Sequence, residues 1–160
     1  MFGLQAALKT PGSSRIMDNQ LYRHPAFTTR AEFLSEDQRV ALAYKRARAV
    51  LEAWNLTVED IAYCSDKFWA MQADPILALD VGCLNILGCH LNLFTGTVCT
   101  VLPSRPDLRP LAESAVRGEF FGHLLLTEVG HGLDIMNLET TATKVDNGFI
   151  LHTPHLGAAK

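Results

Sequence analysis

The sequence predicts an α+β fold, in which a mainly α-helical N-terminal domain is followed by the opening strands of a β domain. After Ser35, apolar residues recur at the three- and four-residue spacing of amphipathic helices. From Phe120 onward the spacing changes to short strand-like runs, and the Asp-Asn-Gly at residues 146–148 is a strong hairpin signal. We therefore expect an extended N-terminal arm over residues 1–35, a helical domain over 36–119 and the opening strands over 120–160.

Two capping boxes mark the expected starts of the first two helices. Ser35 is followed three residues later by Gln38, and Thr57 is followed in the same way by Asp60. The apolar positions after each box predict helices over residues 36–53 and 58–72. Residues 1–34 mix Pro, Gly, Ser, Arg and Thr without a sustained period, so we expect little regular structure in the arm.

Residues 75–102 form the most apolar stretch of the chain and contain no Lys, Arg or Glu. A membrane span is one interpretation, because the length is sufficient. Buried core helices are favoured, since polar residues interrupt the run and Gly88 and Gly96 indicate breaks. Among those polar residues, Asp80 and His90 are expected to be hydrogen-bonded groups of the core rather than metal ligands.

A short helix is expected from about Leu108 to Arg117, ended by Gly118. Beyond it, strands are predicted over residues 120–127, 140–145 and 148–153. Three strands are too few to cover both faces of a sheet, so we expect the chain to be a truncated part of a larger protein. Their unpaired edges predict association with another copy of the chain, as a homo-oligomer, or with another protein.

Composition narrows the classes of partner. With 14 Lys and Arg against 17 Asp and Glu, the net charge of -3 gives no reason to expect nucleic acid or an anionic membrane as a partner. The four cysteines lack a C-x-x-C spacing, which favours reduced thiols in an intracellular protein over disulfides or a metal site. Neither a signal peptide nor a peroxisomal C-terminal tripeptide is visible, so cytoplasm and peroxisome both stay open.

The run Gly130-His131-Gly132 follows a predicted strand and has two interpretations. Two glycines after a strand are most often a tight turn. Alternatively, glycines let the backbone approach a ligand closely, with the hydroxyl of Thr127 as a nearby donor.

The surrounding stretch decides between them. Residues 127–154, TEVGHGLDIMNLETTATKVDNGFILHTP, resemble the acyl-CoA oxidase branch of the acyl-CoA dehydrogenase superfamily. That family carries Thr-Glu-x-Gly-His-Gly, then Leu-Glu-Thr-Thr-Ala-Thr and a Phe-Ile-Leu hairpin ending in Pro. A looser similarity extends upstream through Gly118-x-x-x-Gly122 and the apolar helices, so that it covers residues 36–160. The resemblance implies that the strands open a β-barrel-like middle domain.

The resemblance also implies FAD as cofactor and an acyl-CoA thioester as substrate. Family members remove an α-proton and transfer a β-hydride to the flavin, which must be held by short donors and kept dry. The implied flavin contacts are Leu126, Thr127, Gly130, His131 and Gly132, and the implied substrate contacts are His131 and Leu133. Glu128 and Glu139 are candidates for the catalytic base, but the family's catalytic glutamate lies in a C-terminal helical domain. We therefore expect no catalytic residue and no metal ligand in this chain, weak FAD binding at most, and no activity of the chain alone.

Two other functions stay open. The chain could be a noncatalytic binding or interaction module derived from the same family. It could also be a repurposed enzyme with cofactor-free chemistry, although no nucleophile–base pair stands out in the sequence.

Overall fold

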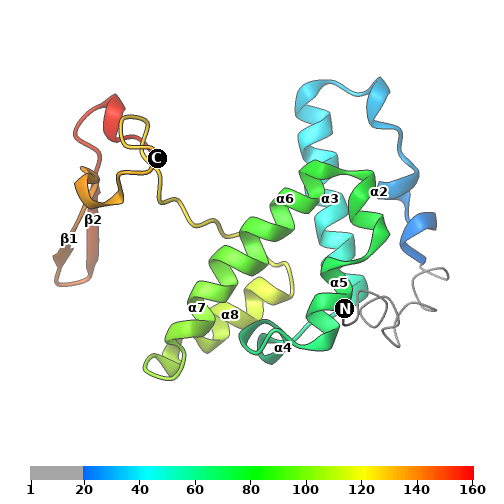
Figure 1. The fold of residues 1–160 in the computed structure, drawn as a ribbon, viewed down its shortest axis with the longest axis horizontal. Helices are drawn as coiled ribbons and strands as arrows, with labels where there is room; N and C mark the ends of the chain where they lie inside the picture. The colour runs from blue at the N-terminus through cyan, green and yellow to red at the C-terminus, as the bar shows by residue number, and fades with distance from the viewer. Residues whose placement is uncertain (1–19) are drawn as a thin grey trace, which may run out of the picture. The chain divides into compact units, whose positions relative to one another are not determined.

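The computed structural model describes residues 20–160, so the first 19 residues of the expected arm lie outside the described part. The chain divides into two compact units, one ending at His123 and one running from Leu124 to Lys160. The first unit is helical, and the second contains a two-stranded antiparallel sheet (Figure 1). These elements confirm the predicted α+β fold class.

Residues 20–33 form short helical segments rather than an extended arm. The segments are the 3-10 helix η2 (Gln20–Arg23), the α-helix α2 (Pro25–Thr28) and the 3-10 helix η3 (Ala31–Phe33). His24 caps α2 by accepting the N–H of Ala26 at 3.2 Å. Leu21 and Ala26 are buried, so this stretch belongs to the packed helical unit, and the expectation of little regular structure is wrong for it.

The longest α-helix, α3 (Glu36–Trp54), begins at the predicted capping box. The Ser35 hydroxyl accepts the N–H of Gln38 at 3.4 Å, and the Gln38 side chain accepts the N–H of Ser35 at 3.0 Å. The helix ends at Asn55, which has the left-handed φ of 42° that is common at helix C-termini. The predicted helix over residues 36–53 is confirmed.

The second predicted helix is in fact two helices, α4 (Val58–Ala62) and α5 (Asp66–Gln72). The chain leaves helical geometry at Cys64, where φ is 47°. It restarts at Ser65, whose hydroxyl accepts the N–H of Phe68 at 3.2 Å and donates to Asp60 at 2.6 Å. Polar side chains that bond the nearby backbone compete with a continuous helix, and this competition explains the difference.

The apolar stretch begins with the 3-10 helix η4 (Pro75–Leu79), and a long helix follows. The long helix consists of α6 (Val81–Leu87), the π-helical segment η5 (Gly88–Thr95) and α7 (Gly96–Val101). Gly88 and Gly96 both have helical φ and ψ, so the predicted breaks are wrong. Between the two glycines the backbone hydrogen bonding changes to the π pattern instead.

By length and composition alone, the long helix could cross a membrane. Of its most apolar 18-residue segment, 33% is buried within the structure. The core helix of a soluble protein passes the same test. Asp80 accepts the N–H of Cys83 at 3.1 Å and pairs with Arg46. His90 is fully buried and has two hydrogen-bond partners. Both residues are hydrogen-bonded groups of the helical unit, as predicted.

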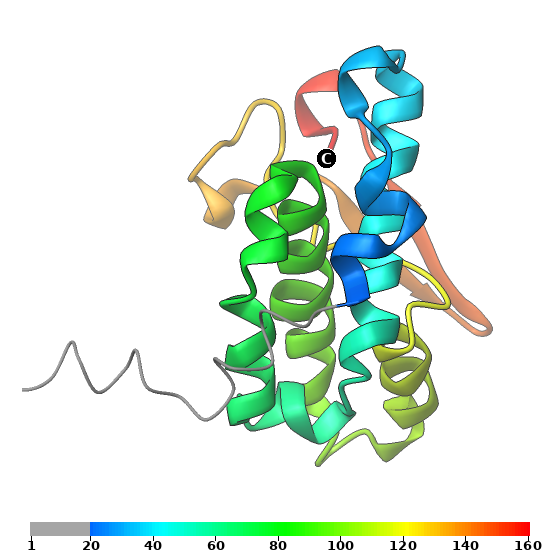
Figure 2. The ribbon, with the colours of Figure 1, turned by 90° about the vertical axis from the view of Figure 1, so that its right-hand side faces the viewer.

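The 3-10 helix η6 (Pro106–Leu108) and α8 (Arg109–Val116) complete the helical unit. The predicted end of this last helix at Gly118 is confirmed by a φ of 68° there. Figure 2 shows α3 alongside the long helix, and α3 and α6 are in contact. The core cluster of this unit includes Val50, Met71, Ile76, Leu87 and Leu91.

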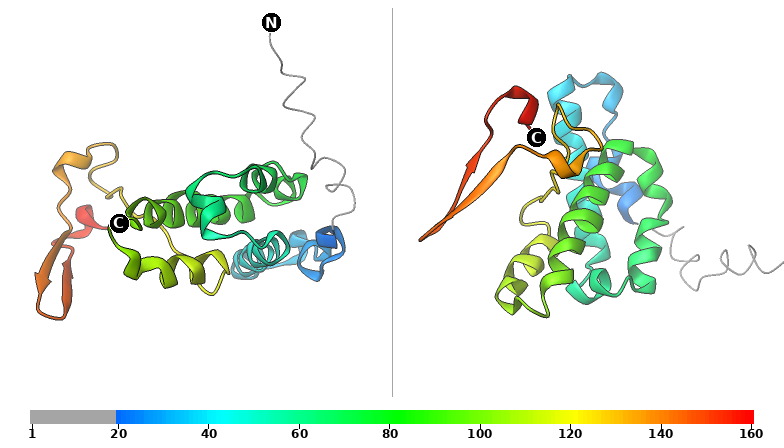
Figure 3. Two further views of the ribbon diagram at one scale, coloured as in Figure 1. Left: turned by 90° about the horizontal axis from the view of Figure 1, so that it is seen from below. Right: turned by 60° about the vertical axis from the view of Figure 1, so that its left-hand side comes forward.

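The second unit is built around one hairpin. Strand β1 (Thr141–Val145) pairs with β2 (Gly148–His152) in an antiparallel hairpin (Figure 3). Thr141 lies opposite His152, and Val145 lies opposite Gly148. Two 3-10 helices, η7 (Ile135–Asn137) and η8 (Leu156–Ala158), flank it. The predicted hairpin is confirmed, but residues 120–127 form no strand. A strand needs a backbone partner, and the two strands of this unit pair with each other.

Arg46 joins three parts of the helical unit. Its Nη1 donates to Oδ2 of Asp80 at 2.7 Å, its Nε to the carbonyl of Ala26 at 2.9 Å and its Nη2 to the carbonyl of Thr29 at 2.9 Å. The residue is only 7% exposed. One buried guanidinium therefore holds α3, the start of α6 and the segment around α2 together.

We expect Arg46→Met to lower the free energy of unfolding by about 3 kcal/mol, because it leaves a half-buried carboxylate and two carbonyls without their donor. Urea unfolding followed by circular dichroism measures the change. Arg39→Met, at an exposed position of the same helix, is the control and should stay within about 0.5 kcal/mol of the parent chain. Equal losses in the two variants would contradict the role of Arg46.

Candidate functional site

The Gly-His-Gly run lies in a tight turn, closed by a bridge between Glu128 and His131. The N–H of His131 donates to the carbonyl of Glu128 at 3.1 Å. The C-terminal residues lie on the same turn, where the N–H of Gly130 donates to the carbonyl of Gly157 at 2.7 Å. The turn and the C-terminal segment are therefore one hydrogen-bonded structure.

The Glu128 carboxylate is buried beneath this turn, with its side chain fully inaccessible. Its two oxygens accept the N–H groups of Glu139 and Thr140, each at 2.9 Å, and Oε1 lies 3.1 Å from Nζ of Lys160. Burial alone would raise the pKa of this carboxyl, but the two backbone donors and the ammonium group lower the pKa to about 2. Glu128 is therefore an ionised group that fixes the start of the hairpin to the turn.

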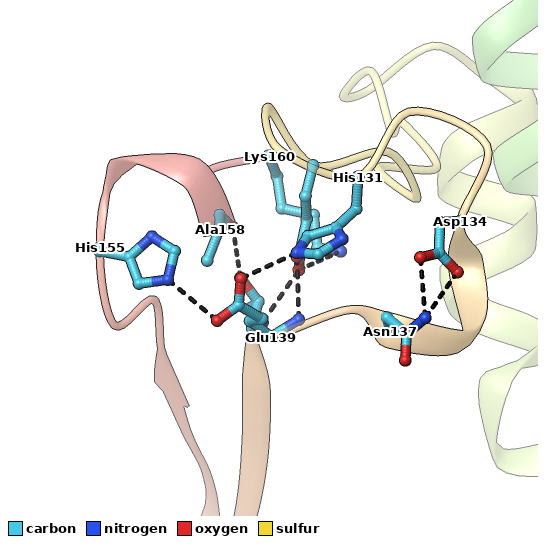
Figure 4. Close-up of polar contacts among 9 residues, drawn as sticks. His131, Asp134, Asn137, Glu139, His155, Ala158 and Lys160 are labelled. Atoms are coloured by element: carbon cyan, nitrogen blue, oxygen red, sulfur yellow. Dashed lines mark hydrogen bonds and ion pairs between the residues drawn. The ribbon is translucent and has the colours of Figure 1, made fainter.

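A second carboxylate, Glu139, lies between two histidines (Figure 4). Its Oε1 is 2.8 Å from Nε2 of His131, and its Oε2 is 2.9 Å from Nε2 of His155. The hydrogen bonds from His131 and His155 lower the pKa of Glu139, and the bond to Glu139 raises the pKa of His131. The bond between His131 and Glu139 orients the His131 ring, and the His131 side chain is 23% exposed.

The two glycines of the turn have different surroundings. A Cβ atom added at Gly130 would lie 3.2 Å from the carbonyl oxygen of Gly157, a tight contact, so the close approach of the chain's own backbone favours glycine here. A Cβ atom added at Gly132 would meet no atom within 4 Å. The turn interpretation therefore accounts for Gly130, whereas the second unit contains no packing reason for Gly132.

The remaining predicted contacts lie on the surface of the second unit. Thr127 is exposed, and Leu133 is fully exposed. The carbonyl of Leu126 accepts a hydrogen bond from Nζ of Lys160 at 3.0 Å, while its side chain is 47% exposed. That these residues and the Gly-His-Gly loop contact a flavin or face a cleft stays a prediction.

Three residues of this arrangement were missed by sequence reasoning. Thr140 donates its hydroxyl to the carbonyl of Ala158 at 2.7 Å, His155 bonds Glu139, and Lys160 pairs with Glu128. Each lies 16 or more residues from its partner in the sequence, and a threonine, histidine or lysine at such a distance has no local pattern that would reveal it. Only the folding of the tail onto the turn brings them together.

The arrangement can hold and orient groups, but it offers no free carboxylate base. Both oxygens of Glu128 and both oxygens of Glu139 have donors, and the pKa of each is lowered. Within residues 20–160, no group of three His, Cys, Asp or Glu side chains could hold a metal ion. A carboxylate that must accept a proton near neutral pH needs the opposite environment.

Several curated proteins are similar to this chain. The acyl-coenzyme A oxidase acox-3 of Caenorhabditis elegans is 30% identical over 137 residues, which cover 85% of this chain and 20% of that protein. Acyl-coenzyme A oxidase 3 of Yarrowia lipolytica is 28% identical over 145 residues, 88% of this chain and 20% of the relative. Acyl-coenzyme A oxidase 1 of the same yeast is 34% identical over 97 residues, 59% of this chain and 14% of the relative.

These matches cover between 14% and 20% of the length of the relatives, so the chain spans a fifth or less of each. No family model matches the chain. No solved structure matches it either.

We expect the second unit to lose stability in acid through Glu128. Because the folded-state pKa of about 2 lies below the ordinary value of 4.5, the stabilisation is complete above pH 4.5 and is lost as the pH falls toward 2. The folded fraction of residues 124–160, followed by their amide NMR signals, measures this loss. In Glu128→Gln the unit should be less stable at pH 7 and less sensitive to acid.

Glu32→Gln provides the control, since Glu32 is an exposed residue of the helical unit. Its acid profile should match that of the parent chain. An unchanged profile in Glu128→Gln would mean that the buried carboxylate does not stabilise the turn.

Proposed function

The chain belongs to the acyl-CoA oxidase family, and from this premise we propose that it forms part of a flavoprotein that uses FAD to dehydrogenate an acyl-CoA thioester between its α and β carbons. The observation that carries the proposal is the Thr127–Leu133 loop. Its buried Glu128 carboxylate bonds it to the start of the hairpin, while Thr127, Gly132 and Leu133 stay exposed. The proposal places the protein inside the cell, in the cytoplasm or the peroxisome.

The exposed residues of this loop fit one edge of a flavin. Gly132 leaves room for a flat ring to lie against the backbone, and Thr127 offers a hydroxyl donor. Val129 and Leu133 expose apolar surface of the kind that keeps water from a cofactor. Gly130 fits this role less well, because the backbone of Gly157 already occupies the space beside it. When bound, the flavin would supply the hydride acceptor, which is chemistry that no side chain can supply.

The residues of the loop would bind and orient rather than react. Thr127 and Gly132, with the backbone of Leu126, would hold the cofactor, and His131 with Leu133 would lie toward the acyl-CoA. Glu139 would keep the His131 ring in one orientation through the 2.8 Å bond. Neither Glu128 nor Glu139 would take the α-proton, because both are fully engaged and have lowered pKa values. The base of the proposed reaction would be a residue other than these two carboxylates.

We expect FAD to bind the 160-residue chain weakly, with NMR shift changes at Thr127 and Gly132. Thr127→Val removes the hydroxyl and keeps the shape, so it should weaken binding by about one hydrogen bond, a factor of roughly five to ten. Gly132→Ala should weaken it as well, and no internal clash would explain that loss. Gly88→Ala, at a position that also has no atom within 4 Å, is the matched control and should leave binding unchanged.

Adding acyl-CoA thioesters to the FAD-loaded chain without oxygen should leave the flavin absorbance unchanged, because neither Glu128 nor Glu139 is free to take a proton. Bleaching of the flavin would contradict the assignment of Glu128 and Glu139 as structural groups. An FAD titration without any shift at Thr127 or Gly132 would remove the support for a flavin site in this loop.

The alternative function is a noncatalytic interaction module, and the hairpin favours it. All ten residues of β1 and β2 are exposed. Phe149, Ile150 and Leu151 are adjacent on β2 and expose 58–75% of their surface, which is unusual for large apolar side chains outside an interface. On this reading a second copy of the chain or another protein would cover the strand edges.

We expect the purified chain to self-associate through this hairpin, because exposed strand edges recruit partners. Sedimentation velocity over a range of concentrations measures the association. Ile150→Lys should shift the chain toward monomer, since a charge on an edge strand opposes pairing. Val40→Lys, at an exposed apolar position of α3, is the control. A monomer of the parent chain at high concentration would contradict the association.

A further inference from the structure

One carboxylate of the second unit bonds two imidazoles that come from different segments. Glu139 lies at the start of the hairpin, His131 belongs to the Gly-His-Gly turn, and His155 directly precedes η8 (Figure 4). Each carboxylate oxygen has one imidazole partner, with Oε1 2.8 Å from Nε2 of His131 and Oε2 2.9 Å from Nε2 of His155. A single side chain therefore fastens three segments of this unit together.

The loop between His131 and Glu139 depends on such polar contacts at its ends. Its apolar side chains contribute little to closing it, because three large ones are exposed by half or more, Leu133, Ile135 and Met136. The ends are held instead by the His131–Glu139 bond and by the backbone N–H groups of Glu139 and Thr140, which donate to Glu128. A change in the His131–Glu139 bond therefore changes how firmly the loop is closed.

The charged groups around the cluster favour a protonated His131. The hydrogen bond to Glu139 raises the pKa of His131 above its ordinary 6.5, burial opposes this shift, and the charges of Glu139, Glu128 and Asp134 add to it. Lys160, on the segment that follows His155, pairs with Glu128 at 3.1 Å. His131 is therefore a cation beside a carboxylate over a wider pH range than a free histidine.

The two partners of this bond respond to pH in opposite directions. Because the pKa of His131 is raised, its charged bond stabilises the fold fully below pH 6.5, and this stabilisation is lost as the pH rises through the raised value. The hydrogen bonds from His131 and His155 lower the pKa of Glu139, so its contribution is complete above pH 4.5 and is lost in acid. The cluster therefore has its full strength between pH 4.5 and 6.5.

We propose that the His131–Glu139–His155 cluster is a pH-operated clip, which holds the Gly-His-Gly turn, the hairpin start and the η8 segment together in mildly acidic solution and loosens in mildly alkaline solution. A neutral imidazole still donates to a carboxylate, but a charge-assisted bond is roughly twice as strong. Glu128 keeps its own partners throughout, since backbone N–H groups and a lysine do not lose their protons near neutral pH. The clip thus loosens one loop without unfolding the unit.

This clip goes beyond the proposed function and requires no flavin, although His131 belongs to the loop of that proposal. NMR titration of the histidine rings in the whole 160-residue chain tests it, and the midpoint of His131 should lie above 6.5. Glu139→Gln removes the charge and keeps the shape, so the midpoint should fall toward 6.5. Asp146→Asn removes an exposed carboxylate of the same unit and should leave the midpoint unchanged. A midpoint at or below 6.5 in the parent chain overturns the clip without any variant.

Amide hydrogen exchange measures the loosening itself. After correction for the pH dependence of unprotected amides, the Thr140 N–H of the parent chain should be about fivefold less protected at about pH 8.5 than at about pH 6. Glu139→Gln should have equal protection at the two pH values, because no charged pair is left to titrate. Asp146→Asn should keep the difference of the parent chain. Equal protection in the parent chain would overturn the clip.

His155→Phe tests whether the η8 segment is part of the clip. The variant keeps a ring and removes the bond to Glu139, so the N–H of Gly130, which donates to Gly157, should exchange about fivefold faster. His131 should still titrate above 6.5. An unchanged Gly130 rate would overturn the part of His155 in the clip. All of these measurements are made without cofactor, so a failed clip leaves the proposed function to be decided by the FAD titration.

Discussion

The helical unit depends on one buried cation, the guanidinium of Arg46. Removing a charge from water is costly, and the cost is offset only where the geometry satisfies most of its donors. Arg46 meets this condition with a carboxylate from the start of α6 and two backbone carbonyls from the α2 region. Apolar packing alone would tolerate small shifts among these three segments, whereas planar, directional bonds allow one arrangement. His90 of the same unit likewise joins separate segments, through its hydrogen bonds to Ala115 and Gly122.

The two units use their buried polar groups in the same way. Arg46 and His90 each join a helix to backbone far away in sequence, and Glu128 joins a turn to the first residues of a hairpin. In each case one side-chain partner satisfies backbone groups that regular structure leaves unpaired. All buried side-chain nitrogen and oxygen atoms in residues 20–160 have a hydrogen-bond partner. In the Thr127–Leu133 loop, Glu128 and Gly130 are consequently hydrogen-bonded to other segments, whereas Thr127, Gly132 and Leu133 are exposed.

Local signals in the sequence were sufficient for much of the fold. The Ser35 capping box, the end of α8 at Gly118 and the hairpin at residues 146–148 each depend on residues within four positions of one another. The errors have non-local or competing causes. Ser65 interrupts a helix that apolar spacing alone would continue. Residues 120–127 have the composition of a strand but lack a partner strand within the second unit.

The candidate site was predictable in kind but not in detail. A motif can identify Gly130 and Gly132 together, yet only the path of the tail shows that the first lies close to the backbone of Gly157 and that the second has no atom beside it. Lys160 and His155 bond to residues of the turn and of the hairpin start that lie far from them in the sequence. No helical or strand periodicity links residues at such separations. The motif also suggested two carboxylates as bases, and their hydrogen bonds give both of them a structural role instead.

The π-helical segment has a consequence for comparing related chains. Each π turn contains about one residue more than an α turn, so residues 88–95 act as a one-residue insertion absorbed within a helix. Each residue of an α-helix turns the following side chains by about 100°. An extra residue that the π segment did not absorb would therefore rotate α7 against its neighbours, whereas a homologue with one residue fewer here can run as a plain α-helix and keep the same side of α7 toward them. A gap inside this segment of an alignment would therefore have a structural meaning. An alignment without a gap there implies that His90 faces the same way in both proteins.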